Sequence, residues 1–159
     1  MEQQTTVFIA DSSEDFCAGL AAQLQRSEGF QVAGTANDGE KAVALITARK
    51  PQVLVLDLML SKKDGIGVLK AIAELERPPV TLATSAFLTD YISSAAAGLG
   101  VRYLMLKPCD MTALVERLEE IRGGESLRIS AARRPTRAVI SQGFSIKYRT
   151  PRFAAAEEM

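Results

Sequence analysis

The strongest constraint on the fold is a regular alternation of short apolar runs with longer segments whose apolar residues recur every three or four positions. Short runs of β-branched and aliphatic residues are typical of strands, whereas the longer period is typical of amphipathic helices. The alternation repeats five times within residues 1–124, with connections of only a few residues. The expected strands cover residues 5–10, 30–36, 53–56, 80–84 and 102–106, and the expected helices cover residues 14–26, 40–49, 64–76, 88–97 and 110–123.

The third strand is expected to lie in the middle of a parallel sheet. Residues 53–56 read VLVL, and such a continuous aliphatic run is typical of a strand that is buried on both faces. Strands that alternate with helices require right-handed crossovers, which place helices on both faces of the sheet. The sequence therefore predicts an α/β fold, namely a flavodoxin-like (βα)5 doubly wound parallel sheet with strand order 2-1-3-4-5.

The net charge of zero conceals two different parts of the chain. Residues 1–124 carry 12 basic and 16 acidic side chains, whereas residues 125–159 carry 7 basic and 3 acidic ones. We therefore interpret residues 1–124 as one domain and residues 125–159 as a basic linker or tail, either a truncated output region or vector-derived sequence. A basic arm that contacts nucleic acid or a partner is the alternative, and residues 139–148 are compatible with a short hairpin or strand.

Several classes of chemistry and location are excluded by composition. Histidine is absent, which removes histidine-based acid–base catalysis, histidine metal ligands and phosphohistidine chemistry. Cys17 and Cys109 are too few for a disulfide framework or a zinc site, so we expect reduced packing thiols in a cytoplasmic protein. No apolar run reaches the ~18 residues of a membrane span, and the first residues lack the pattern of a signal peptide. No membrane partner is therefore expected.

Charged and hydroxyl residues follow four of the expected strands. Asp11 follows the first, Asp57 the third, Ser85 the fourth and Lys107 the fifth. The carboxyl ends of parallel strands share one edge of the sheet, and ligands of doubly wound sheets bind there. Oxygen ligands suit Mg²⁺, an aspartate can form an acyl phosphate, and Lys107 and Ser85 can neutralise and bind phosphoryl oxygens. Taken singly, Asp11 and Ser85 are also compatible with helix caps and Lys107 with a solvated charge.

These residues resemble the receiver domain of bacterial two-component response regulators over about residues 7–121. The resemblance rests on the order of four short motifs: Asp57 after the aliphatic strand, Asp64-Gly65, Ser85-Ala86, and Lys107-Pro108, whose peptide bond is typically cis in the family. It implies that Asp57 is the phosphoacceptor, assisted by Ser85 and Lys107. It also implies a Mg²⁺ cofactor held by Asp11, Asp57 and the backbone carbonyl of Met59.

Within the family, residues 10–11, 85–87 and 106–111 look most like the stage 0 sporulation protein A branch, the master sporulation regulators of endospore-forming Firmicutes. This closer likeness implies an output in transcription or sporulation. DNA would then be bound only through an output domain that is not present in this chain.

Three positions depart from the family pattern. Ser12 stands where the family usually has a second acid that contacts the metal, so Mg²⁺ should bind more weakly. Glu14 or Asp15 can compensate from the first helical turn or simply cap the helix. The loop after the third strand has Leu60-Ser61 in place of a common proline. Leu104, beside Tyr103, stands where a switch aromatic usually lies.

The resemblance implies that a histidine kinase or phosphotransferase transfers a phosphoryl group to Asp57, and that the chain is not itself an enzyme. The added charge of about −1.5 to −2 would draw in Ser85 and Lys107 and shift the face formed by the fourth helix, fifth strand and fifth helix. In the family that face supports homodimers or contacts an output domain. Candidate contacts with the donor, for which core packing is the alternative, are Ala18, Leu20, Cys109 and Asp110.

Two other functions remain open from the sequence. Ser12 is also compatible with a pseudo-receiver, a protein-interaction module of the same fold with impaired Mg²⁺ binding. An enzyme on this fold is disfavoured because no glycine-rich loop follows the first strand for nucleotide or FMN binding. A phosphatase with an aspartate nucleophile after its first strand would need a second aspartate where Ser13 stands.

Overall fold

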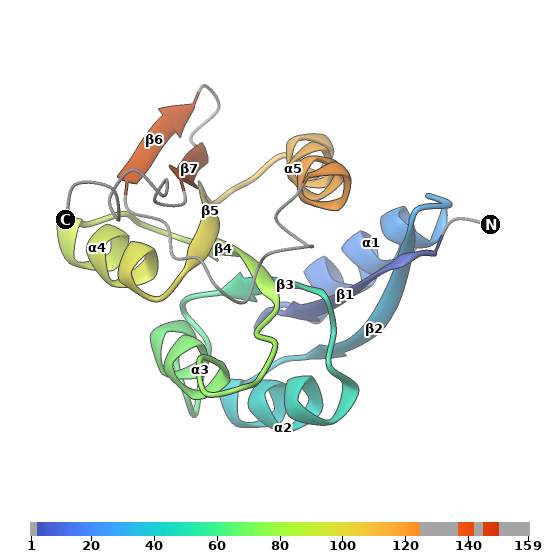
Figure 1. Cartoon of the computed structure of the whole chain (residues 1–159), viewed down its shortest axis with the longest axis horizontal. Coiled ribbons are helices and arrows are strands. Elements are labelled where there is room, and N and C mark those ends of the chain that lie inside the picture. Colours follow the sequence, from blue (N-terminus) through green and yellow to red (C-terminus); the bar gives the residue numbers. More distant parts are fainter. Residues whose placement is uncertain (1–2, 125–136, 142–144, 150–159) are drawn as a thin grey trace, which may run out of the picture.

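Five parallel strands form the centre of the sheet in the order β2-β1-β3-β4-β5 (Figure 1). The computed structural model describes residues 3–124, 137–141 and 145–149. This order confirms the predicted flavodoxin-like topology, with β1 next to β3 at the point where the winding reverses. The strands are β1 (Thr5–Ala10), β2 (Phe30–Ala36), β3 (Val53–Asp57), β4 (Val80–Ser85) and β5 (Val101–Leu106).

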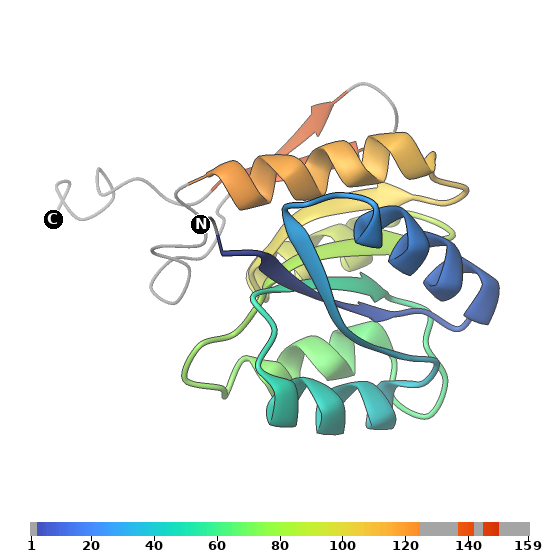
Figure 2. The same cartoon turned by 90° about the vertical axis from the view of Figure 1, so that its right-hand side faces the viewer.

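Five helices cover the two faces of the sheet (Figure 2). Helices α1 and α5 pack on one face, and α2, α3 and α4 pack on the other. The helices are α1 (Glu14–Gln25), α2 (Gly39–Arg49), α3 (Gly65–Ile72), α4 (Asp90–Gly98) and α5 (Met111–Gly123). Within the described part of the chain, no helix is both long and apolar enough to cross a membrane.

Each helix begins after a residue whose side-chain oxygen accepts a hydrogen bond from a backbone N–H of the first turn. Such caps satisfy donors that have no partner within the helix, which explains why the short polar groups in the sequence mark helix starts. The capping residues are Ser13, Asp38, Asp64, Thr89 and Asp110.

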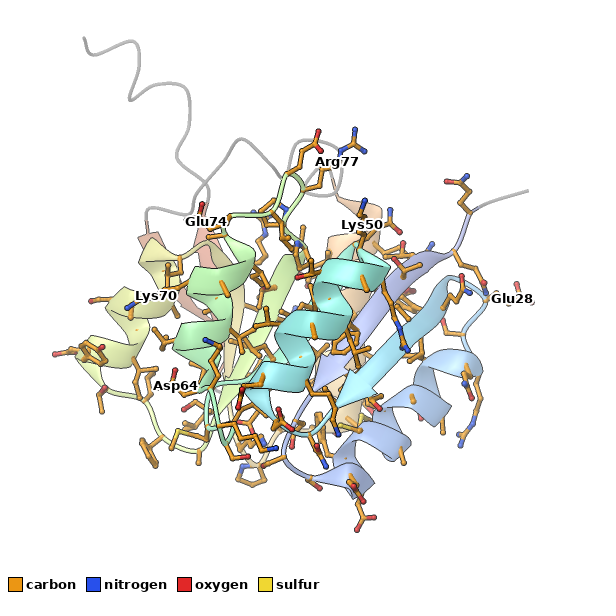
Figure 3. All side chains as sticks on the ribbon, turned by 90° about the horizontal axis from the view of Figure 1, so that it is seen from below. Glu28, Lys50, Asp64, Lys70, Glu74 and Arg77 are labelled. Atoms are coloured by element: carbon orange, nitrogen blue, oxygen red, sulfur yellow. The ribbon has the colours of Figure 1, made fainter. Side chains whose placement is uncertain are left out.

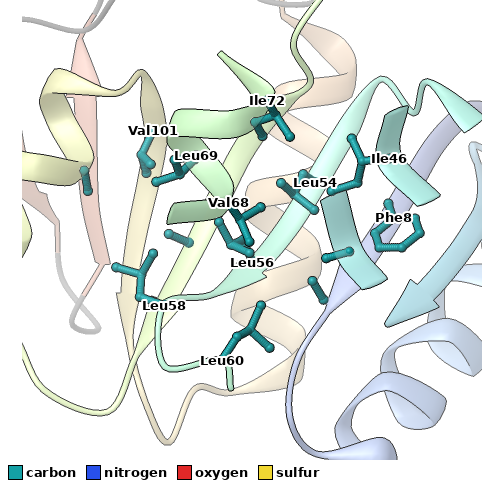
Figure 4. Packing of buried hydrophobic residues seen from close by; sticks show 14 of the residues in the cluster. Phe8, Ile46, Leu54, Leu56, Leu58, Leu60, Val68, Leu69, Ile72 and Val101 are labelled. Atoms are coloured by element: carbon teal, nitrogen blue, oxygen red, sulfur yellow. The ribbon is translucent and has the colours of Figure 1, made fainter. Parts of the chain in front are cut away.

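The alternation of side chains along the strands divides the core into two clusters. Successive residues of β3 point to opposite faces, so Leu54 and Leu56 join the cluster under α2 and α3 (Figure 4). Val53 and Val55 join the cluster under α1 and α5. All five residues of β3 are buried, which confirms that the VLVL run is the central strand.

Two helix boundaries differ from the predictions by more than one residue. The predicted helix 64–76 ends at Ile72, because the following residues form a tighter turn. In this turn the Leu75 N–H donates a hydrogen bond to the Ile72 carbonyl at 3.0 Å. This turn leads towards Pro78-Pro79 and into β4. The predicted helix 88–97 begins only at Asp90, because Thr89 is its cap and Leu88 lies in the preceding loop.

Two further strands lie beyond β5 and form an antiparallel hairpin. Strand β6 (Arg137–Ser141) pairs with β7 (Ser145–Arg149), and β7 pairs with β5. Residues 139–148, which are compatible with a short hairpin or strand from their sequence, therefore contribute to a hairpin, and the whole sheet has seven strands. The rest of the basic tail, which includes Arg128, Arg133, Arg134 and Arg152, lies outside the described residues.

Candidate functional site

Two carboxylates meet at the carboxyl edge of the sheet. Asp57 is the last residue of β3, and Asp11 directly follows the adjacent strand β1. Asp11 is 1% exposed and Asp57 is 2% exposed, so both carboxylates lie almost entirely out of water. Burying two like charges side by side is costly without a positive partner.

Lys107 supplies that positive partner from the end of β5. Its Nζ lies 2.8 Å from Asp11 Oδ2 and 3.2 Å from Asp57 Oδ2, so the ammonium bridges both carboxylates. The ring of Phe16, on the first turn of α1, lies 5.5 Å from the same nitrogen. The Lys107–Pro108 peptide bond is cis, as the motif predicts.

The pKa of Lys107 shows that the ammonium is stabilised in this position. Partial burial acts to lower the pKa of Lys107, but hydrogen bonds and charge interactions with Asp11 and Asp57 outweigh it. The pKa therefore lies above the ordinary value of a lysine, and Lys107 is positively charged at neutral pH.

Backbone amides hold the remaining carboxylate oxygens. Asp11 Oδ1 accepts a hydrogen bond from the Ser13 N–H at 2.8 Å, and Asp57 Oδ1 accepts one from the Met59 N–H at 2.9 Å. The Ser12 hydroxyl also points into the cluster and donates to Asp57 Oδ2 at 3.4 Å. Both carboxylates are thus fixed in orientation before any ligand binds.

The Ser85 hydroxyl does not join this cluster. It donates to the backbone carbonyl of Phe87 at 2.6 Å, inside the loop between β4 and α4. The Ser85 carbonyl, however, accepts a hydrogen bond from the Lys107 backbone N–H at 2.8 Å. This bond connects the end of β4 to Lys107. To reach a phosphoryl oxygen, the Ser85 hydroxyl would have to leave Phe87.

Comparison with known proteins decides the family. The family model described as the response regulator receiver domain matches residues 7–119. The chain belongs to this family. The signal receiver domain of NarL from Mycobacterium tuberculosis is 29% identical, with a TM-score of 0.71 over 77% of this chain and 99% of that one.

Two further structures support the receiver fold. A chain of the CheX–CheY–BeF3–Mg²⁺ complex from Borrelia burgdorferi is 28% identical, with a TM-score of 0.65 over 74% of this chain and 88% of that one. The isolated receiver of RcsB from Salmonella enterica serovar Typhimurium, with phosphomimetic BeF3⁻, is 23% identical with a TM-score of 0.68 over 77% of this chain and 91% of that one. At this last identity, the likeness shows the fold alone.

The single-residue alternatives are wrong for this receiver. Asp11 and Ser85 do not cap helices, because Ser13 caps α1 and Thr89 caps α4. Lys107 is not a solvated charge, since it bridges two buried carboxylates.

The oxygen donors of the receiver suit a Mg²⁺ ion that keeps several waters. Among the described residues, no group of three or more Asp, Glu, Cys or His side chains is placed to hold a metal ion. Asp11 and Asp57 are two buried carboxylates at this edge. Mg²⁺ is commonly bound through one or two carboxylates together with waters and phosphate oxygens. Glu14 and Asp15 are exposed on the first turn of α1, and Glu14 accepts a hydrogen bond from Asn37 at 3.3 Å.

The position of the usual switch aromatic is filled by buried Leu104. Leu104 packs with Ala83 and Ala96 in the cluster under α4. Tyr103 points to the opposite face and donates its hydroxyl to Glu120 of α5. Burial, followed by the interaction with Glu120, raises the pKa of Tyr103 to about 12. Tyr103 therefore serves packing against α5 and does not take the place of the missing aromatic.

The expected donor contacts divide into exposed and buried residues. Leu20 is fully buried between α1 and the sheet, so the core-packing alternative is correct for it. Ala18 and Asp110 are exposed, and Cys109 is half-buried. Cys17 is buried, its thiol donates to the Asp11 carbonyl at 3.5 Å, and burial raises its pKa, as expected of a packing thiol.

A cleft lies at the other end of the sheet. It has a volume of about 490 Å³ and is lined by residues that include Lys50, Gln52 and Arg77. Figure 3 shows Lys50 and Arg77 at the opposite end from Asp64, the cap of α3. No residue of the carboxylate cluster lines this cleft, so the cleft is separate from the receiver site.

Sequence reasoning missed the roles of two residues beside the site, Phe16 and Phe87. Phe16 carries a weak signal, since the sequence predicts it on the first helix but says nothing of its approach to Lys107. Phe87 acts through its backbone carbonyl, which no side-chain pattern reveals. Thr84 is fully buried, and its hydroxyl has no hydrogen-bond partner among the described residues.

Replacing Thr84 with valine is expected to raise the free energy of unfolding by about 1 kcal/mol, because a buried unpaired hydroxyl is removed at nearly constant shape. The matched control is Thr81→Val in the same strand, where the hydroxyl donates to the Pro79 carbonyl at 3.4 Å. That change should leave stability unaltered or lower it. Urea unfolding of both variants checks the pair, and equal effects would contradict the assignment.

Proposed function

We propose that this receiver is a phosphorylatable switch that accepts a phosphoryl group on Asp57 from a phosphohistidine of a kinase or phosphotransferase. The observation that carries the proposal is the buried Asp57 carboxylate, held by the Met59 amide and bridged to Asp11 by Lys107. The absence of histidine fits a donor that is another protein.

The transfer balances as a displacement at phosphorus. An oxygen of Asp57 forms the new P–O bond while the P–N bond to the donor imidazole breaks, and the imidazole keeps the electron pair and takes up a proton. The product is an acyl phosphate on Asp57. Lys107 lies within 3.2 Å of Asp57 Oδ2 and supplies positive charge where phosphoryl oxygens would arrive. Release of the Ser85 hydroxyl from Phe87 would provide a further hydrogen-bond donor.

The site would hold Mg²⁺ through Asp11, Asp57 and the Met59 carbonyl. When bound, the ion supplies charge neutralisation to the phosphoryl oxygens. The Mg²⁺ and BeF3 named for the similar CheX–CheY complex support this part of the proposal. Ser12 would present only a hydroxyl where a second carboxylate would add charge.

Replacing Ser12 with aspartate is expected to tighten Mg²⁺ binding on the order of tenfold, or about 1.4 kcal/mol, because it adds a carboxylate beside Asp57. A titration of both proteins with MgCl2, followed by the amide resonances of residues 11–13 and 57–59, measures the change. Ser13→Asp is the control, because the Ser13 side chain caps α1 and is not part of the cluster. Equal affinity of wild type and Ser12→Asp would show that residue 12 does not face the ion.

The proposal includes a change at one face of the receiver after Asp57 is phosphorylated. The acyl phosphate would draw Ser85 and Lys107 inward and alter the face formed by α4, β5 and α5, which would control dimerisation or an output. The likeness of residues 10–11, 85–87 and 106–111 to sporulation regulators implies an output in transcription or sporulation, which stays a prediction. The cytoplasmic location and the absence of enzyme activity also stay predictions.

A pseudo-receiver is the second candidate, because Ser12 lowers the negative charge at the metal position while Lys107 already bridges Asp11 and Asp57. Beryllofluoride, which mimics a phosphoryl group, separates the two functions. With Mg²⁺, wild type should show shifts of the Ser85 and Lys107 amide resonances that are absent from Asp57→Asn. No change in wild type at millimolar Mg²⁺ would favour the pseudo-receiver.

A further inference from the structure

The free edge of β5 is occupied by the hairpin of this same chain. Without the hairpin, β5 would be the last strand of the parallel sheet. Strand β7 pairs with it in antiparallel orientation, with Tyr103 opposite Lys147, Leu104 opposite Ile146 and Met105 opposite Ser145. Strand β6 then pairs with the outer side of β7.

An open edge strand exposes a row of backbone donors and acceptors that can pair with another chain. The pairing with β7 satisfies such groups over residues 103–105. Strand addition of this kind is a common way for proteins to bind an extended segment, because the backbone supplies the hydrogen bonds. The β5 edge is therefore a surface built to accept an antiparallel strand.

The hairpin also contacts a helix of the receiver. Figure 1 shows it beside β5 and close to α4, and α4 and β6 are in contact. The paired residues 103–105 end two positions before Lys107, which bonds to the carboxylates. The strand β7 therefore pairs with a segment of β5 that lies next to the carboxylate cluster in the chain.

The charges of the two parts are complementary. The sequences of β6 and β7 contain three basic residues and no acidic one. Residues 1–124 carry a net charge of −4, from 12 basic and 16 acidic side chains. Attraction between these parts favours docking of the hairpin on its own receiver.

We propose that the β5 edge, between α4 and α5, is a strand-docking surface whose resident occupant is the hairpin β6–β7 of the same chain. A partner, including a second copy of this chain, reaches the edge only by displacing the hairpin. The inference concerns strand pairing alone and holds whether or not Asp57 is phosphorylated.

Backbone hydrogen exchange in the full chain tests the docking. The variants are Ile146→Pro and Lys147→Pro: successive amides of β7 point alternately to β5 and β6, so one of the two prolines removes an N–H that faces β5. Ile146→Val is the control, because valine keeps the backbone donor. We expect the amides of residues 103–105 that point away from β4 to exchange at least tenfold faster in one proline variant and unchanged in Ile146→Val.

The amides of β1 and β3 serve as the internal reference for intact folding. If the reference amides stay protected and residues 103–105 exchange equally in all four proteins, the hairpin does not dock on β5 and the proposal is wrong. Sedimentation velocity over a range of concentrations identifies the occupant. A monomeric mass with concentration-independent protection supports docking within one chain. A dimeric mass with protection that rises with concentration would show docking by a second copy and overturn the proposal.

Discussion

Replacing Lys107 with methionine is expected to lower the free energy of unfolding by about 2–3 kcal/mol in the absence of Mg²⁺. The ammonium is the cation that bridges Asp11 and Asp57, which are 1% and 2% exposed. Breaking a buried ion pair from one side costs about 3–5 kcal/mol, and the 26% exposure of the Lys107 side chain reduces that cost. Methionine keeps the apolar stem against Phe16, so the lost charge dominates the effect.

Urea unfolding with and without Mg²⁺ measures this effect. The deficit of Lys107→Met should shrink when Mg²⁺ is added, because an ion bound by the two carboxylates restores a positive partner to the folded state. Lys107→Arg is the control, since it retains the charge and should lose less stability than the methionine variant. Equal stability of wild type and Lys107→Met without Mg²⁺ would mean that the bridge contributes nothing to the fold.

Replacing Gly65 with alanine is expected to destabilise the protein by about 3 kcal/mol and to disturb the site. A Cβ at position 65 would lie 2.4 Å from Leu58 Cα and 2.9 Å from the Asp57 carbonyl oxygen. Both are backbone atoms, one in the last residue of β3 and one in the residue after it, and they cannot move away as a flexible side chain would. The start of α3 would have to shift, and with it the loop that carries the Met59 amide bonded to Asp57.

The control for Gly65→Ala is Gly98→Ala, at the end of α4. A Cβ at Gly98 would meet nothing within 4 Å, so alanine should be neutral or stabilise the helix by up to about 1 kcal/mol. Thermal or urea unfolding of the two variants checks the contrast. If Gly65→Ala were as stable as Gly98→Ala, the close approach of α3 to β3 would not be a constraint on this fold.

The fold was predictable because its signals are local and agree with one another. The buried VLVL strand, the alternation of strands and helices, and the capping residues Asp64 and Asp110 all indicate the observed topology. The end of α3 was not predictable from periodicity, because apolar Leu75 continues the helical pattern after the backbone has left it. The predicted start of the fourth helix at Leu88 was wrong for a similar reason, because apolar Leu88 fits the helical pattern but lies in a loop.

The site was predictable in its composition and less so in its geometry. Parallel strands bring their carboxyl ends to one edge, so Asp11, Asp57 and Lys107 had to lie near one another. The orientation of the Ser85 hydroxyl depends on a loop carbonyl, and the packing of Phe16 on Lys107 depends on how α1 lies on the sheet. Neither contact produces a periodic pattern in the sequence, so only the three-dimensional structure reveals it.

The central claim is that Asp57 accepts a phosphoryl group. Its most direct test is intact-mass spectrometry of the full chain after incubation with acetyl phosphate and Mg²⁺, followed by peptide mapping. We expect wild type to gain one phosphoryl group on the peptide that contains Asp57, and to gain none when Mg²⁺ is chelated or when Asp57 is replaced with asparagine. A wild type that gains no phosphoryl group with Mg²⁺, or an Asp57→Asn variant that gains as much as wild type, would contradict the claim.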